Sequence, residues 1–289
     1  LTIELCIFNS NSAAEGCSLY FDAANPPTIQ LCEFNYHETL SSIITIKTYN
    51  TPSYDLENCT FQNNHYGGTQ NIGGSGFVFE YRNTEGDEVL ATTDLFLTGC
   101  EFSENSAQTA GAFGLENLNN IKQITIDSCV FIGNIATQNT GGALSYNSGA
   151  DLLIQNCDFS NNNAKTNGGS ICLVLNARSP QITNCAFKLD TANGQGNSIY
   201  CSDTVENQYL SMSYNTFTDC GSSGFSIYAQ NKYLVFRSNT ISFSQMIDSC
   251  SGLILDNYGD FQITDCKFSK CSAKGINDFG GAIHYVYPS

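Results

Sequence analysis

The chain has 289 residues, and 41% of them are hydrophobic, which is enough for a large core and argues against a disordered chain. Its 27 acidic and 11 basic residues give a formal net charge of -16, which disfavours binding to nucleic acids and to anionic membrane surfaces. No apolar run is long enough to span a membrane, and the first residues, LTIELCIFNS, lack a signal-peptide pattern.

Ten related units follow one another along the whole chain. Each unit has a Cys or Asn, here called the anchor, with Phe two positions later in nine units and Ile in one. Most anchors lie about 27 residues apart, and the step from Cys59 to Cys100 is longer, at 41 residues. In chain order, the anchors are Cys6, Cys32, Cys59, Cys100, Cys129, Cys157, Cys185, Asn215, Asn239 and Cys266.

The residues around each anchor predict two short strands. Three positions before the anchor every unit has an apolar residue, and five positions before it most units do, a period of two that indicates a strand. The Phe after the anchor is in phase with the anchor but not with this strand. Two corner residues, such as Asp127-Ser128, therefore separate the first strand from the second.

A further corner and a third strand complete the unit. Five units have Asn three positions after the Phe, where the side-chain amide can hydrogen-bond along a stack and the backbone tolerates a left-handed conformation. A Gly-rich turn and an apolar stretch follow, as in GGALSY and GGAIHYV. The five Asn residues are Asn11, Asn64, Asn105, Asn134 and Asn162.

Three short strands per unit and no helical period predict an all-β fold, a right-handed parallel β-helix of about ten coils forming one domain over residues 1–289. A leucine-rich-repeat solenoid is the alternative, because IDSCVFIGNIA also fits the core of that repeat. The second half of each unit favours the β-helix, since it has Gly, Asn and β-branched residues where a leucine-rich repeat needs a helix. Because the pattern already includes residue 1, we expect a fragment of a longer repeat protein.

Two recurring tetrapeptides resemble a known family. FNSN, FQNN, FSEN, FIGN and FSNN match the pattern FxxN, while GGAL and GGAI match GGA[ILV], and GGSI is close. Their ordered recurrence resembles the repeats of the polymorphic outer-membrane proteins. The resemblance implies a β-helical, exported and often adhesive protein at the cell surface, and it supplies no catalytic residue.

The spacing of the cysteines favours buried thiols in the core over disulfide bonds. Seven consecutive anchors are Cys, an odd run that cannot pair completely within itself, and Asn replaces Cys in two later units, so we expect most anchor cysteines to be buried free thiols. Disulfides are more plausible among the other six, with a pairing that the sequence does not define. These are Cys17, Cys172, Cys201, Cys220, Cys250 and Cys271.

Few residues are candidates for catalysis, metal binding or modification. The chain has no Trp, no paired-aspartate motif and no metal-binding cysteine motif, so we predict no catalytic residue and no cofactor. The long step between anchors contains a protruding loop near residues 81–94, whose acidic residues are the one candidate for binding Ca²⁺. These are Glu85, Asp87 and Glu88. Asn58, in the triplet NCT, is a candidate glycosylation site.

These observations predict a non-enzymatic structural or adhesive segment of a large exported or surface protein, a rigid rod contributing to a filament, coat or attachment. Its partners would be other copies of the chain or other chains of a surface assembly, joined laterally or end to end, with no nucleic acid and no direct membrane insertion. The alternative is a carbohydrate-active β-helix enzyme, a polysaccharide lyase or hydrolase, or a glycan-binding module. Three converging carboxylates in a groove would favour the alternative.

Overall fold

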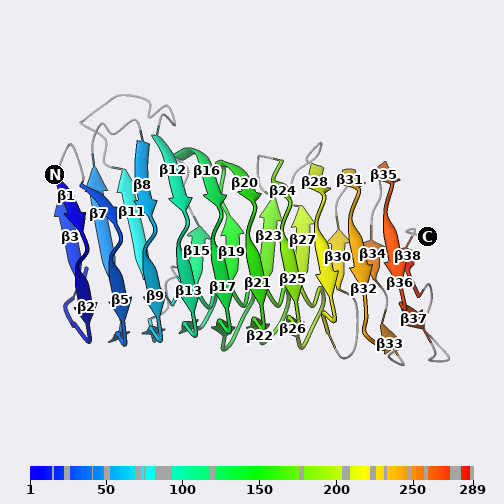
Figure 1. Cartoon of the computed structure of the whole chain (residues 1–289), viewed down its shortest axis with the longest axis horizontal. Helices are drawn as coiled ribbons and strands as arrows, with labels where there is room; N and C mark the ends of the chain where they lie inside the picture. The colour runs from blue at the N-terminus through cyan, green and yellow to red at the C-terminus, as the bar shows by residue number, and fades with distance from the viewer. Residues whose placement is uncertain are drawn as a thin grey trace.

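A computed structural model describes residues 1–14, 16–22, 27–40, 42–48, 53–68, 73–74, 76–81, 93–116, 121–175, 179–203, 209–221, 226–230, 233–245, 249–250, 252–256, 260–273 and 281–286. All regular structure in these residues is β, and none of it forms a helix that could cross a membrane. The strands stack as a solenoid, with the two chain termini at opposite ends of its long axis (Figure 1). The predicted all-β solenoid of about ten coils is therefore confirmed.

Two parallel sheets of ten strands each run along the solenoid, one strand per coil. The strand before each anchor belongs to the first sheet: β1 (Thr2–Glu4), β4 (Thr28–Gln30), β8 (Ser53–Glu57), β12 (Thr93–Thr98), β16 (Ile121–Asp127), β20 (Asp151–Gln155), β24 (Gln181–Thr183), β28 (Tyr209–Ser213), β31 (Tyr233–Arg237) and β35 (Phe261–Thr264). The strand after each anchor belongs to the second: β2 (Ile7–Asn9), β5 (Glu33–Asn35), β9 (Thr60–Gln62), β13 (Glu101–Ser103), β17 (Val130–Ile132), β21 (Asp158–Ser160), β25 (Ala186–Lys188), β29 (Thr216–Thr218), β32 (Thr240–Ser242) and β36 (Lys267–Ser269).

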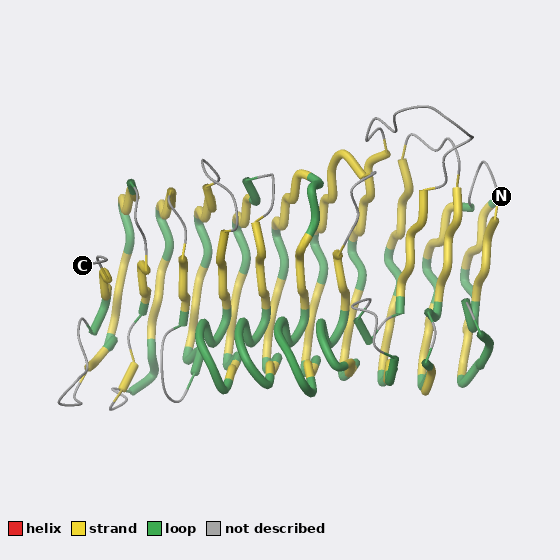
Figure 2. The backbone as a smooth tube through the Cα atoms, turned by 180° about the vertical axis from the view of Figure 1, so that it is seen from behind, coloured by secondary structure: helices red, strands yellow, loops and turns green. Residues whose placement is uncertain are grey.

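The predicted third strand forms a three-stranded and a seven-stranded sheet. The former contains β3 (Leu19–Asp22), β7 (Ile44–Thr48) and β11 (Phe77–Tyr81), and the latter β15 (Phe113–Glu116), β19 (Leu144–Asn147), β23 (Ile171–Leu175), β27 (Ile199–Asp203), β30 (Ile227–Gln230), β34 (Leu253–Asp256) and β38 (Ile283–Val286). Strands recur from coil to coil along the whole solenoid (Figure 2). Near the C-terminus, β33 (Ser249–Cys250) pairs antiparallel with β37 (Ser272–Ala273).

The sequence did not predict a fourth strand, which has two residues and follows the column of Asn residues. These strands form a six-stranded sheet of their own: β6 (Glu38–Thr39), β10 (His65–Tyr66), β14 (Ser106–Ala107), β18 (Ile135–Ala136), β22 (Asn163–Ala164) and β26 (Thr191–Ala192). A strand of two residues is too short to show a period of two in the sequence.

The corners are made by single residues with a left-handed backbone. In all ten units the residue directly before the anchor has a positive φ, for example Ser128 at 55° and Asn156 at 55°. The next corner also has one, but it is the residue before the column Asn, such as Asn161 at 55°, and not the column Asn itself. We therefore correct one expectation, because the column Asn serves hydrogen bonding and its neighbour makes the turn.

The paired glycines allow coils to approach closely. Gly141 has a φ of 70°, which favours glycine. Its neighbour Gly142 has no space for a side chain, since an added Cβ would lie 1.9 Å from the carbonyl oxygen of Gly169 in the next coil. The GG motif thus combines a turn with a backbone contact between coils.

The core is built from columns of identical side chains. Rings of Phe102, Phe131 and Phe159 stack in register, with centroids 4.9 Å and 4.8 Å apart and nearly parallel planes. The column extends from Phe8 to Phe217 and continues as Ile241, which pairs with Phe217. All ten units therefore place this residue inward, as the pattern predicts.

The anchors form a second column, and the structure explains why this position accepts both Cys and Asn. Cys129 Sγ lies 3.5 Å from the carbonyl oxygen of Leu97 in the preceding coil and is placed to donate to it. In later coils the amide of Asn215 donates to the carbonyl of Ile182 at 2.9 Å, and Asn239 does likewise. Both side chains are small donors to the equivalent carbonyl.

The anchor thiols in the middle of the rod are expected to resist alkylation in the folded protein. Contact with the preceding thiol, followed by burial, raises the pKa of Cys129, Cys157 and Cys185, and only the thiolate reacts quickly. Native protein treated with N-ethylmaleimide should carry no label at these three residues by mass spectrometry, whereas the half-buried Cys6 should react. Equal labelling of Cys6 and Cys157 without denaturant would contradict this expectation.

Candidate functional site

A buried ladder of side-chain amides crosses several coils. Asn64, Asn105, Asn134 and Asn162 are almost fully buried, and the side-chain nitrogen of each of the first three donates to the oxygen of the next at 3.0–3.1 Å. Each amide also donates to the carbonyl of the Phe column in the preceding coil, as Asn134 does to Phe102 at 2.9 Å. The ladder satisfies buried backbone groups and fixes the register of the coils.

Titratable side chains occupy both ends of this ladder. His37 is buried, with Nδ1 3.0 Å from the side-chain oxygen of Asn64 and Nε2 2.7 Å from Ser18 Oγ, and burial lowers its pKa. At the other end, the backbone and side-chain nitrogens of Asn162 both donate to Asp190 Oδ1, at 3.0 Å and 3.3 Å. Complete burial raises the pKa of Asp190 to about 7, although the bonds from Ser170 and Asn162 oppose this.

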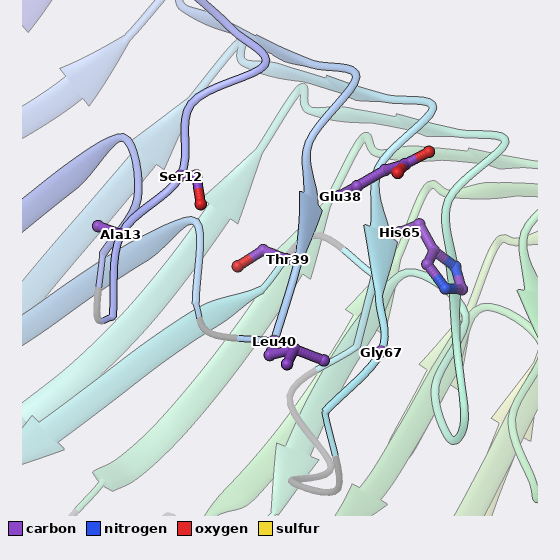
Figure 3. A pocket seen from close by; sticks show the side chains of 7 residues that line it. All are labelled: Ser12, Ala13, Glu38, Thr39, Leu40, His65 and Gly67. Atoms are coloured by element: carbon purple, nitrogen blue, oxygen red, sulfur yellow. The ribbon is translucent and has the colours of Figure 1, made fainter.

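A pocket opens on the outer side of the first coils, where the six-stranded sheet begins (Figure 3). It has a volume of about 470 Å³ and is lined by Ser12, Ala13, Glu38, Thr39, Leu40, His65 and Gly67. Segment 11–14 of the first coil is not a strand, so it leaves the edge of the sheet open at β6. The pocket therefore combines residues from three successive coils.

Glu38, His65 and Ser106 form a polar row beside this pocket. They occupy matching positions on β6, β10 and β14, since His65 pairs in register with both Glu38 and Ser106. His65 Nδ1 lies 2.8 Å from Ser106 Oγ, and both His65 and Glu38 are exposed. Sequence analysis missed this row because outward positions of the two-residue strands are not repeated. His65 and Ser106 each follow a column Asn directly, and this position in the repeat would have located both of them.

The predicted site residues are not brought together. Asn58 is exposed, has a φ of 50° and lies against Gly99 of the next coil, so the predicted glycosylation site is at an accessible corner. Glu85, Asp87 and Glu88 lie outside the described residues, as does most of the loop near 81–94. Within the described part of the chain, no three His, Cys, Asp or Glu residues gather to hold a metal.

The cysteines outside the anchor column occupy unrelated places. Cys17, Cys220 and Cys271 are free thiols, and the last two continue the column of the buried amides, three positions after Phe. Cys172 pairs with Tyr200 and Cys201 with Leu173, so the two side chains lie on opposite faces of their sheet. Cys250 belongs to β33. The pairing of these six in an oxidised protein stays a prediction.

Comparison with known proteins supports the architecture. The sequence matches the family described as right handed beta helix region over residues 96–245, which is more than half of the chain. No curated protein and no solved structure gives a significant match. The matched region contains the stacked rings from Phe102 to Phe217 and the ladder from Asn105 to Asp190. The chain therefore belongs to the right-handed beta helix family.

Proposed function

We propose that this chain is a rigid, non-enzymatic segment of an exported or cell-surface protein, which acts as a structural spacer or adhesive rod. The fold alone is compatible with a structural rod and with a polysaccharide-cleaving enzyme. The observation that carries the proposal is the direction of the repeated residues. Phe, anchor and column Asn all point inward, so the repeat encodes a stack, whereas the outward residues vary from coil to coil.

The dimensions of the stack support a spacer. Ten coils, each adding about 4.8 Å, make a rod roughly 50 Å long. Aromatic and amide columns tie each coil to its neighbours, and such solenoids are stabilised mainly by contacts between adjacent repeats. The resemblance of FxxN and GGA[ILV] to repeats of polymorphic outer-membrane proteins supports the proposed location at the cell surface.

Assays of polysaccharide turnover distinguish the proposed structural function from the alternative enzymatic one. The purified chain should produce no new reducing ends and no unsaturated uronates from a panel of neutral and acidic polysaccharides, while a known lyase and a known hydrolase serve as positive controls. Turnover of any polymer by the chain would overturn the non-enzymatic proposal. We would then map the active residues by substituting the exposed acids, beginning with Glu38.

Shape and location test the other half of the proposal. Small-angle X-ray scattering should show an elongated particle whose maximum dimension does not change with salt concentration. Antibodies against the chain should label intact, unpermeabilised cells of the source organism. A flexible profile, or labelling only after permeabilisation, would contradict a rigid surface segment.

A further inference from the structure

The pocket beside β6 contains a carboxylate and an imidazole on neighbouring strands. Glu38 and His65 are paired in register, both are exposed, and both line the pocket (Figure 3). Register neighbours on one face of a parallel sheet have backbones about 4.8 Å apart, so two long side chains can reach one small ion between them. Hydroxyl groups of Ser12 and Thr39 line the same pocket.

Ser106 prepares His65 to act as a ligand. An imidazole that binds a metal through Nε2 carries its proton on Nδ1, and it almost always donates that proton to a neighbouring acceptor. Ser106 Oγ lies 2.8 Å from His65 Nδ1 and can accept it. Gly67, which lines the pocket, is on the side of the ring that carries Nε2, since its Cβ position would lie 3.9 Å from that atom. The unprotonated nitrogen can therefore face the pocket.

We propose that Glu38 and His65 bind Zn²⁺, and that a second copy of the chain completes the site with the same two residues. Zn²⁺ in a closed site takes four ligands, and one copy supplies two of them. Imidazole with carboxylate suits Zn²⁺, whereas Ca²⁺ and Mg²⁺ prefer sets of oxygen ligands. The inference rests on the proposed function as a rod and adds to it a lateral contact between two copies.

Charge explains why a cation would be needed at this contact. Each copy carries a net charge of -16, and approach through this pocket brings two Glu38 carboxylates together. Like charges without a bound cation oppose this approach, and a divalent ion between them removes the repulsion where it is strongest. Association through this face should therefore depend on the metal.

Sedimentation velocity and isothermal titration calorimetry with ZnCl₂ test the proposal on the whole chain. Zn²⁺ should convert monomer to dimer with one ion per two chains, EDTA should reverse this, and Ca²⁺ or Mg²⁺ should have no effect. His65→Ala and Glu38→Gln should each weaken dimerisation at least tenfold. Glu33→Gln, which removes an exposed carboxylate from β5, is the matched control and should behave like the parent chain.

Two further measurements assign the role of each group. Ser106→Ala should weaken Zn²⁺ binding about tenfold, as removal of an outer partner of a metal-binding His usually does, and Ser106→Thr should restore it. Co²⁺ in place of Zn²⁺ should show no thiolate charge-transfer band, which separates this site from the cysteines.

Three results would overturn the inference: no dimer with Zn²⁺, one ion per monomer, or an unchanged dimer in His65→Ala. The rod itself does not depend on this outcome. If Zn²⁺ has no effect while scattering still shows a stiff, elongated particle, the metal site is refuted and the proposed function stands.

Discussion

Asp190→Asn is expected to stabilise the protein above neutral pH and to flatten the dependence of its stability on pH. Burial raises the pKa of Asp190 to about 7 in the folded protein, from the ordinary aspartate value of about 3.8. The folded state therefore holds this proton more tightly than the unfolded state does. Its contribution favours folding below about pH 4, is lost as the pH rises from about 4 to about 7, and stays constant above that.

The rise of this pKa to about 7 corresponds to a loss of stability on the order of 4 kcal/mol across this window. Asparagine keeps the oxygen that accepts from Asn162, and its amide can continue the ladder to the carbonyl of Phe159, as Asn162 does to Phe131. Urea unfolding of the parent and the variant at pH 4, 6 and 8 measures the effect. Because Asp158 is exposed, Asp158→Asn is the matched control, and its pH profile should follow that of the parent. Parallel profiles for Asp190→Asn and the parent would refute the prediction.

Phe131→Ala should reduce the free energy of unfolding by about 3–5 kcal/mol, the usual cost of removing a buried aromatic side chain. Phe131 is fully buried between the rings of Phe102 and Phe159, so its removal leaves a cavity between two rings that the pairing of their strands holds in place. In a solenoid the loss should be local, because each coil contacts mainly its neighbours. Hydrogen exchange should therefore rise first in β13, β17 and β21.

Phe131→Ile is the control for this prediction, because the column itself accepts Ile241, which is fully buried in β32. We expect it to cost about half as much as Phe131→Ala, or less, since Ile retains most of the apolar volume. If both variants lose the same stability, the stacking of aromatic rings matters more than filled volume. If neither loses stability, the column does not hold the coils together.

Much of the fold could be predicted because the residues that recur in the sequence are the ones that form the core. The residues before the anchors, the anchors and the Phe recur at fixed spacing, and ten copies of a period-two pattern outweigh the ambiguity of any one. The same reasoning failed where repetition stops. His37 and Asp190 occupy the column of the buried amides, three positions after Phe, but they are not Asn, so reading by residue type passed over them.

The candidate site was less predictable for a related reason. Glu38, His65 and Ser106 are outward residues on strands of two residues, and nothing in their local sequence marks them. Their proximity comes from register across coils 27 and 41 residues apart, which only the stacked backbone defines. The left-handed residue of the second corner was also misplaced by one position, because the recurring Asn marks the amide column, whereas the residue before it, which makes the turn, varies in type.

The six-stranded sheet reinforces only some of the coils, so the mechanical strength of the rod varies along its axis. This sheet and the buried ladder with its two ends cover the same coils, from β6 and His37 to β26 and Asp190, and they end together. In the part of the chain that the structure describes, the coils beyond β26 add no further strand to this sheet. A pulling force along the axis would therefore detach the coils outside this sheet first, at both ends of the rod, and the coils joined by β6 to β26 would remain as a residual tether.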